Sequence, residues 1–173
     1  KNLPTGIFSY VADDRWVFTE DNPRRELYVA AALSAASRVL REPNPELADE
    51  ALETALALWT SASQVEGNSP SKVIALSELI LTTDDPELKK ILISMKEDIV
   101  THIGRCGWAV GHVIHQIEDK AFREEIDKAV DDYQQQLTKQ TESDSPYGVP
   151  YKPHIWGAGW KIQKFGVEQY FFN

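Results

Sequence analysis

Apolar side chains recur every three to four residues along most of the chain, with charged and polar residues between them. This spacing places the apolar positions on one face of a helix and predicts helices rather than strands. No two segments form a convincing strand pair, so the predicted fold class is all-α. The expected helices lie at about residues 23–40, 45–65, 73–80, 84–103, 120–138 and 155–172.

The first 22 residues differ from the rest because they show no helical period. Their aromatic residues fall at even spacings, which predicts a short strand or an extended segment lying on a core. These residues are Phe8, Tyr10, Trp16 and Phe18. The chain therefore divides into an irregular lead-in segment, residues 1–22, and a single helical domain, residues 23–173.

Turn and cap signals separate the predicted helices. Asn22 followed by Pro23 is typical of a helix start, with asparagine as the cap and proline at the first helical position. Small residues surround much of the helix at 23–40, which suits a crowded inner position. Glycines interrupt residues 104–118, which predicts a break with a loop or short helix there. Short loops between helices favour antiparallel helical hairpins as the architecture.

Composition narrows the function classes. Apolar residues make up 42% of the 173 residues and charged residues 26%, which is typical of a globular protein with a packed core. The formal net charge of −9 argues against nucleic acid and anionic membranes as partners, although not against a neutral sugar. No apolar run reaches the roughly 18 residues of a membrane span. The single cysteine, Cys106, is expected to be a small buried residue.

Other reactive side chains do not form a recognisable site. His102, His112 and His115 complete no known metal-ligand spacing, so neither a metal nor a cofactor is predicted. The neighbouring carboxylates Asp13 and Asp14 are interpreted as part of a solvated turn beside Arg15. Glu168 lies inside a predicted helix and is interpreted as structural.

The segment 145–160 is the most informative part of the sequence. Within residues 147–160 it places two tyrosines, two tryptophans and a histidine, with prolines that stiffen the chain and glycines that leave space. Sugar rings pack their C–H faces on aromatic rings and need polar partners at the edge. Aromatic residues beside a helix start therefore favour sugar binding. The alternative is that they are core residues under a surface loop.

The run Tyr147-Gly148-Val149-Pro150-Tyr151, continued by Ile155-Trp156-Gly157-Ala158-Gly159-Trp160, resembles a segment of family 9 glycoside hydrolases. The alanine-rich stretch from Leu27 to Leu40 is similar to an inner helix of the same family. The resemblance covers about residues 20–173. It implies an (α/α)6 barrel, built from antiparallel helical hairpins, that hydrolyses β-1,4-glucans with inversion.

Inversion needs a general acid and a general base about 6.5–9.5 Å apart. In this family the base belongs to an Asp-Ala-Gly-Asp motif upstream of the region matched here, and the acid is a glutamate near the domain end. The sequence contains neither motif, so no catalytic residue is assigned. The resemblance implies an inactive fragment of a barrel whose parent protein is secreted, periplasmic or at the cell surface.

The resemblance places an oligo- or polysaccharide against Tyr151, His154, Trp156 and Trp160. Tyr151 and His154 precede the helix and are the preferred contacts, whereas Trp156 is expected to be partly structural. Half a barrel would leave apolar helix faces unpaired, which predicts self-association. The competing hypothesis is a complete helical protein-interaction module without catalytic function.

Overall fold

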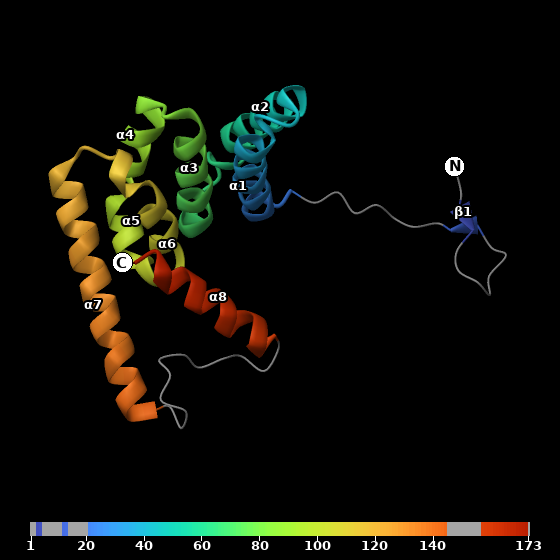
Figure 1. Ribbon diagram of the computed structural model, residues 1–173. Helices are drawn as coiled ribbons and strands as arrows, with labels where there is room; N and C mark the ends of the chain where they lie inside the picture. Colours follow the sequence, from blue (N-terminus) through green and yellow to red (C-terminus); the bar gives the residue numbers. More distant parts are fainter. Residues whose placement is uncertain (1–2, 5–11, 14–20, 145–156, 173) are drawn as a thin grey trace.

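The computed structural model describes residues 3–4, 12–13, 21–144 and 157–172, and it confirms the all-α class (Figure 1). The lead-in segment contributes one pair of antiparallel two-residue strands, β1 (Leu3–Pro4) and β2 (Ala12–Asp13). The helices that follow are α1 (Pro23–Leu40), α2 (Pro45–Ala62), α3 (Ser69–Thr83), α4 (Pro86–Ser94), α5 (Lys96–Thr101), α6 (Ile103–Val113), the 3-10 turn η1 (Ile114–Gln116), α7 (Lys120–Asp144) and α8 (Ala158–Tyr170).

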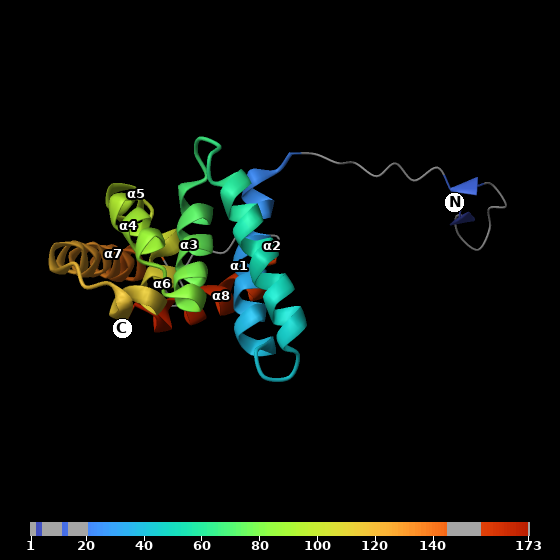
Figure 2. The same cartoon turned by 90° about the horizontal axis from the view of Figure 1, so that it is seen from above.

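The first hairpin forms as the cap signals predict. The Asn22 side chain accepts a hydrogen bond from the Arg25 backbone N–H at 3.0 Å, and Asn44 accepts one from the Leu47 N–H at 3.2 Å. A proline follows each cap at the start of α1 and α2. Figure 2 shows that α2 runs back along α1, whereas α3 runs beside α1 in the same direction. Helix α1 therefore lies between α2 and α3.

The core is centred on α3 and α6. Leu76, Leu79 and Ile80 of α3 are completely buried, as are Ala109 and Val110 of α6. Helix α3 contacts α1 on one side and α6 on the other, while α7 covers α5 and α6. In α1 the small residues were predicted to suit a crowded inner position. Its buried residues face α2 and α3, the two helices that it contacts.

The structure corrects the prediction for residues 84–118. The expected fourth helix is divided at Met95 into α4 and α5, and the break falls at His102. The region 104–118 then forms the short helix α6 and the turn η1, which was one of the two predicted alternatives. A Cβ at Gly104 would lie 2.7 Å from the Tyr133 ring, and one at Gly107 would lie 2.6 Å from the Phe172 ring. Glycine at these positions therefore allows the two rings to pack directly against α6. These tertiary contacts offset the low helix propensity of glycine.

Helix boundaries differ from the predicted ones by a few residues elsewhere. Helix α2 ends before residue 65, α3 begins before residue 73, α7 continues beyond residue 138 and α8 begins after residue 155. The extended α7 keeps its buried stripe on α5 and α6 only along its first part. Boundaries of this kind depend on capping contacts that a hydrophobic period does not encode.

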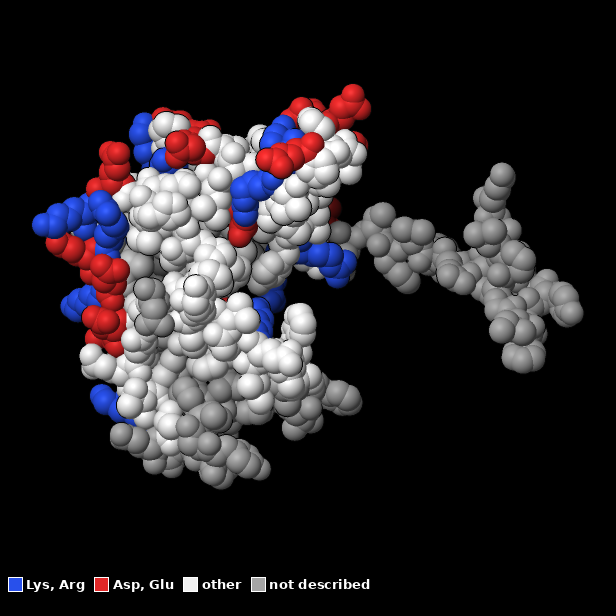
Figure 3. Space-filling model, viewed as in Figure 1, with Lys and Arg blue, Asp and Glu red and all other residues white. Residues whose placement is uncertain are grey.

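Charge is distributed unevenly over the surface. In the view of Figure 3, acidic and basic side chains gather over α7, α4 and α2, whereas the middle of this face, over α3 and α6, shows little charge. Exposed large apolar residues lie in α1 and α8, among them Tyr28, Val39 and Trp160. Within the described part of the chain, no helix has the length and apolar character required to cross a bilayer.

Candidate functional site

The four residues predicted to contact a sugar are described only in part. Tyr151, His154 and Trp156 lie outside the described residues, so their positions stay predictions. Trp160 lies in the first turn of α8 and is 73% exposed. Gly157 precedes this turn with a φ of 70°, a left-handed conformation that glycine adopts without a steric penalty. The start of α8 therefore presents an open backbone and one exposed indole.

Helix α8 is attached to the rest of the domain mainly through the turn that follows it. The Phe171 carbonyl oxygen would lie 2.1 Å from a Cβ at Gly111, and the Phe172 ring packs at Gly107 and beside Tyr133. On the opposite face of α8, Trp160, Val167 and Tyr170 are exposed at helical spacing. This side of α8 thus presents an aromatic and apolar stripe to solvent.

A group of polar side chains joins the C-terminal halves of α1, α3 and α6, and we call it the polar layer: Ser34, Arg38, Glu78, Thr82 and His112. The Ser34 hydroxyl donates to the Glu78 carbonyl at 2.9 Å. Arg38 donates to the same carbonyl at 3.0 Å and to Thr82 Oγ1 at 2.7 Å, and it pairs with the Glu78 carboxylate. The polar layer therefore fixes α1 against α3 by directional bonds rather than by apolar contact alone.

His112 connects the polar layer to α8. Its Nδ1 lies 4.0 Å from Glu78 Oε1, and its ring meets the Phe171 ring edge-on, with centroids 3.7 Å apart. Trp108 contacts it from within α6 at 5.9 Å. Burial lowers the pKa of His112; Glu78 opposes this shift and Arg38 adds to it. The imidazole is thus held in its neutral form, where it packs as an aromatic ring.

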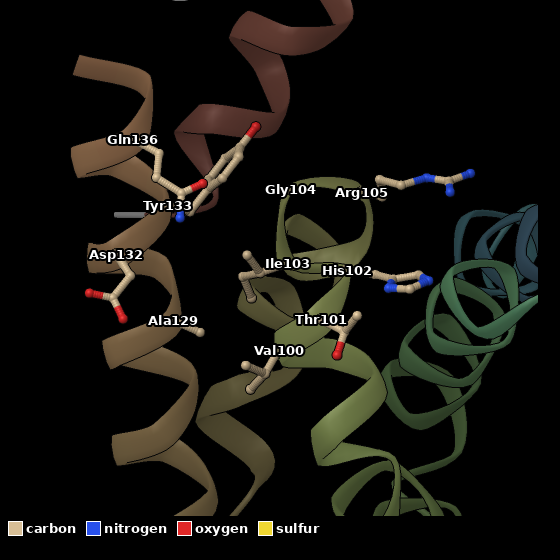
Figure 4. A pocket seen from close by; sticks show the side chains of 10 residues that line it. All are labelled: Val100, Thr101, His102, Ile103, Gly104, Arg105, Ala129, Asp132, Tyr133 and Gln136. Atoms are coloured by element: carbon tan, nitrogen blue, oxygen red, sulfur yellow. The ribbon is translucent and has the colours of Figure 1, made fainter. Parts of the chain in front are cut away.

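A cavity of about 540 Å³ lies between α7 and the junction of α5 with α6. Figure 4 shows Asp132, Tyr133 and Gln136 on the α7 side, while His102 and Arg105 point away from α7. The α7 side of the cavity therefore carries a carboxylate, a phenol and an amide, and of these Asp132 and Gln136 are exposed. Such a set can hydrogen-bond hydroxyl groups, but among the lining residues Asp132 is the one carboxylate, so the cavity does not supply the carboxylate pair that glycoside hydrolysis uses.

Other candidate residues have structural surroundings. Glu168 pairs with Lys164 at 3.4 Å, and burial raises the pKa of its carboxyl while Lys164 opposes that shift. Burial, followed by the charge of Glu168, raises the pKa of Tyr133. Asp13 belongs to β2, whereas Asp14 lies outside the described residues.

The prediction that Cys106 is buried is confirmed, and burial raises the pKa of its thiol to about 12. A thiol with that pKa is not a nucleophile at neutral pH. Among the described residues, no three His, Cys, Asp or Glu side chains gather in a metal-binding group.

The polar layer was missed by sequence reasoning. Its bonded members are separated by 40 to 48 residues where α1 meets α3, so no local motif contains them. The one available signal was Ser34 together with Ser37 on the otherwise apolar face of an alanine-rich helix, where buried hydroxyls need partners.

Comparison with known proteins finds no matching family model, no matching curated protein and no matching solved structure. The arrangement of the described residues is therefore the basis for any functional conclusion.

Proposed function

We propose that this chain is part of the helical barrel of a family 9 type glycoside hydrolase, where it forms one wall of a β-1,4-glucan cleft without supplying the catalytic carboxylates. The observation that carries the proposal is Trp160, a largely exposed indole at the start of a helix whose outer face has no partner among the described residues. The resemblance of residues 147–160 to the family supplies the substrate class.

The arrangement of helices supports a barrel as the parent architecture. Helices α1, α3, α6 and α8 bring their C-terminal ends together around the polar layer and Phe171. Helices α2, α4 and α7 lie on the outside and carry most of the charge in the view of Figure 3. An inner row of helices with an outer, solvated row is the layering that an α/α barrel requires.

The chemistry of the site supports sugar binding rather than catalysis. An exposed indole offers a flat apolar face to sugar C–H groups, and the start of α8 leaves backbone N–H donors for hydroxyls. The net charge of −9 opposes anionic ligands but not a neutral glucan. We expect the isolated chain to hydrolyse no β-1,4-glucan, and turnover by this chain alone would contradict the assignment.

Binding by the isolated chain can be measured with cellohexaose by isothermal titration calorimetry. Trp160→Ala is expected to weaken binding by about tenfold, which corresponds to about 1.4 kcal/mol. Tyr170→Ala is the matched control because Tyr170 is also exposed, at 75%, on the same helix but near its other end. Equal losses in both variants would show that binding does not depend on the start of α8.

The preferred contacts Tyr151 and His154 are tested in the full-length enzyme. Tyr151→Ala or His154→Ala should raise KM or lower kcat/KM by about tenfold, with little change in melting temperature. If these variants unfold the protein and leave the kinetics of the folded fraction intact, the loop belongs to the core.

The second candidate function is a helical protein-interaction module, and the charge-poor surface over α3 and α6 is the observation that favours it. Exposed apolar stripes of α1 and α8 would then dock a partner protein or a second copy. The length of the native reading frame separates the candidates, because a much longer surrounding chain favours the barrel.

A further inference from the structure

A second cavity lies under the turn that follows α8, and it is separate from the start of that helix. It has a volume of about 340 Å³ and lies between α6, α7 and the C-terminal turn. Ile114, Ile126 and Val130 give it an apolar floor, and Phe171 and Phe172 form an aromatic wall. Its size falls at the lower end of small-molecule sites, which suits a compact ligand rather than a polymer.

Asp127 and Asp131 form the rim of this cavity, one helical turn apart on α7. Two other acidic residues of α7 pair with lysines: Glu124 lies 3.5 Å from Lys120, and Glu125 lies 2.5 Å from Lys96. Within the described part of the chain, Asp127 and Asp131 have no such partner. Like charges four residues apart destabilise a helix by about 0.2–0.5 kcal/mol, a cost that a bound cation would remove.

We propose that this cavity binds a small organic ammonium ion, with its apolar body on the floor and its charged head between Asp127 and Asp131. The aromatic wall adds to the attraction, since a cation near the face of a phenylalanine ring is stabilised by the ring quadrupole. Two carboxylates and an apolar floor disfavour anions and offer little to a neutral polyol. The inference is independent of the proposed glucan site, because none of its residues lies at the start of α8.

The probe is 2-phenylethylammonium, titrated into the isotopically labelled 173-residue chain and followed by amide chemical shifts. A ligand of this size has an expected dissociation constant of about millimolar. Saturable shifts should appear at Ile126, Val130 and Phe172. The neutral analogue 2-phenylethanol should bind at least tenfold more weakly, because it has the apolar body but no charge.

The doubly substituted chain Asp127→Asn with Asp131→Asn should also lose at least tenfold in affinity. Asp132→Asn is the matched control, because it removes an acidic side chain of the same helix that lines the other cavity. Equal binding of the alcohol, an equal loss in the Asp132 variant, or no saturable shift at the floor residues would each overturn the proposal. Circular dichroism confirms that each variant is folded before the comparison is made.

Discussion

Helices α3 and α8 have similar lengths, 15 and 13 residues, but opposite relations to the core. Nine residues of α3 are buried, and apolar side chains extend around most of its circumference. No described side chain of α8 is fully buried, and its exposed face carries Trp160, Val167 and Tyr170. An all-round apolar helix needs neighbours on every side, whereas the described contacts of α8 with other helices lie toward its C-terminal end.

The difference indicates where each helix obtains its stability. Helix α3 is held by packing along its whole length, so each buried side chain contributes directly to the free energy of unfolding. Among the described contacts, those of Phe171 and Phe172 at the C-terminal end join α8 to α6 and α7. A surface that binds a polymer or a partner is expected in the second kind of region.

The largest expected effect comes from cavity formation in α3. Leu79→Ala should lower the free energy of unfolding by about 2–5 kcal/mol, because Leu79 is completely buried and its methyl groups leave a void. Val167→Ala in α8 is the control, since Val167 is 62% exposed and should change stability by no more than about 0.5 kcal/mol. Urea unfolding followed by circular dichroism measures both values. Similar losses in the two variants would show that α8 is packed as tightly as α3.

The next effect concerns the docking of α8. Gly111→Ala places a methyl group against the Phe171 carbonyl oxygen, so the C-terminal turn must shift, at a cost of about 1–3 kcal/mol. Gly166→Ala is the matched control, because nothing lies within 4 Å of a Cβ there and alanine favours the helix. Hydrogen exchange should quicken across α8 in the first variant only. Unchanged exchange in Gly111→Ala would mean that α8 is held by other contacts.

These glycines also show how far the sequence determined the fold. The apolar period predicted the all-α class, and the cap signal at Asn22 and Pro23 located the start of α1. Gly104, Gly107 and Gly111 predicted a break because helix propensity considers each residue alone. Their role is to admit Tyr133 and the C-terminal turn, which come from distant parts of the chain. The break therefore falls earlier than predicted, at His102, and tertiary packing holds the short helix α6 together despite its glycines.

The candidate site was less predictable than the fold. Aromatic and proline spacing directed attention to residues 145–160, and Trp160 is exposed at the start of a helix as a sugar contact requires. The two cavities and the polar layer were not predicted, because each is built from residues of helices that are distant in the sequence. A hydrophobic period predicts which face of a helix is buried, but it does not predict which other helix packs against that face.

A smaller effect is expected from the ion pair of the polar layer. The Glu78 side chain is 12% exposed and Arg38 is 34% exposed, so solvent weakens their attraction only in part. Glu78→Gln should reduce the free energy of unfolding by about 1 kcal/mol, because Arg38 keeps its bonds to the Glu78 carbonyl and Thr82. Glu87→Gln, which breaks the exposed pair with Lys90, is the control and should leave stability unchanged. If both variants behave alike, the polar layer does not stabilise the junction of α1 with α3.

The smallest effect is a dependence on pH that originates at His112. Burial lowers the pKa of this imidazole in the folded chain, so the unfolded chain binds its proton more readily. The stability that His112 contributes is therefore fully present at a pH above its pKa in the unfolded chain, about 6.5. It is lost as the pH falls toward the lower pKa of the folded chain. The charges of Glu78 and Arg38 also act on the ring: Glu78 raises its pKa and Arg38 lowers it.

Because the His112 ring lies against Phe171, protonation should loosen α8 before it affects α3. Hydrogen exchange in α8 should quicken between about pH 7.5 and pH 5, beyond the intrinsic change with pH, while α3 stays protected. His112→Gln should remove this acid sensitivity, and His115→Gln, which alters an exposed histidine of η1, should retain it. If the His112 variant loosens on acidification as the unmodified chain does, another group controls the docking of α8. If α3 loses protection together with α8, the two helices unfold as one unit and the contrast between them does not hold.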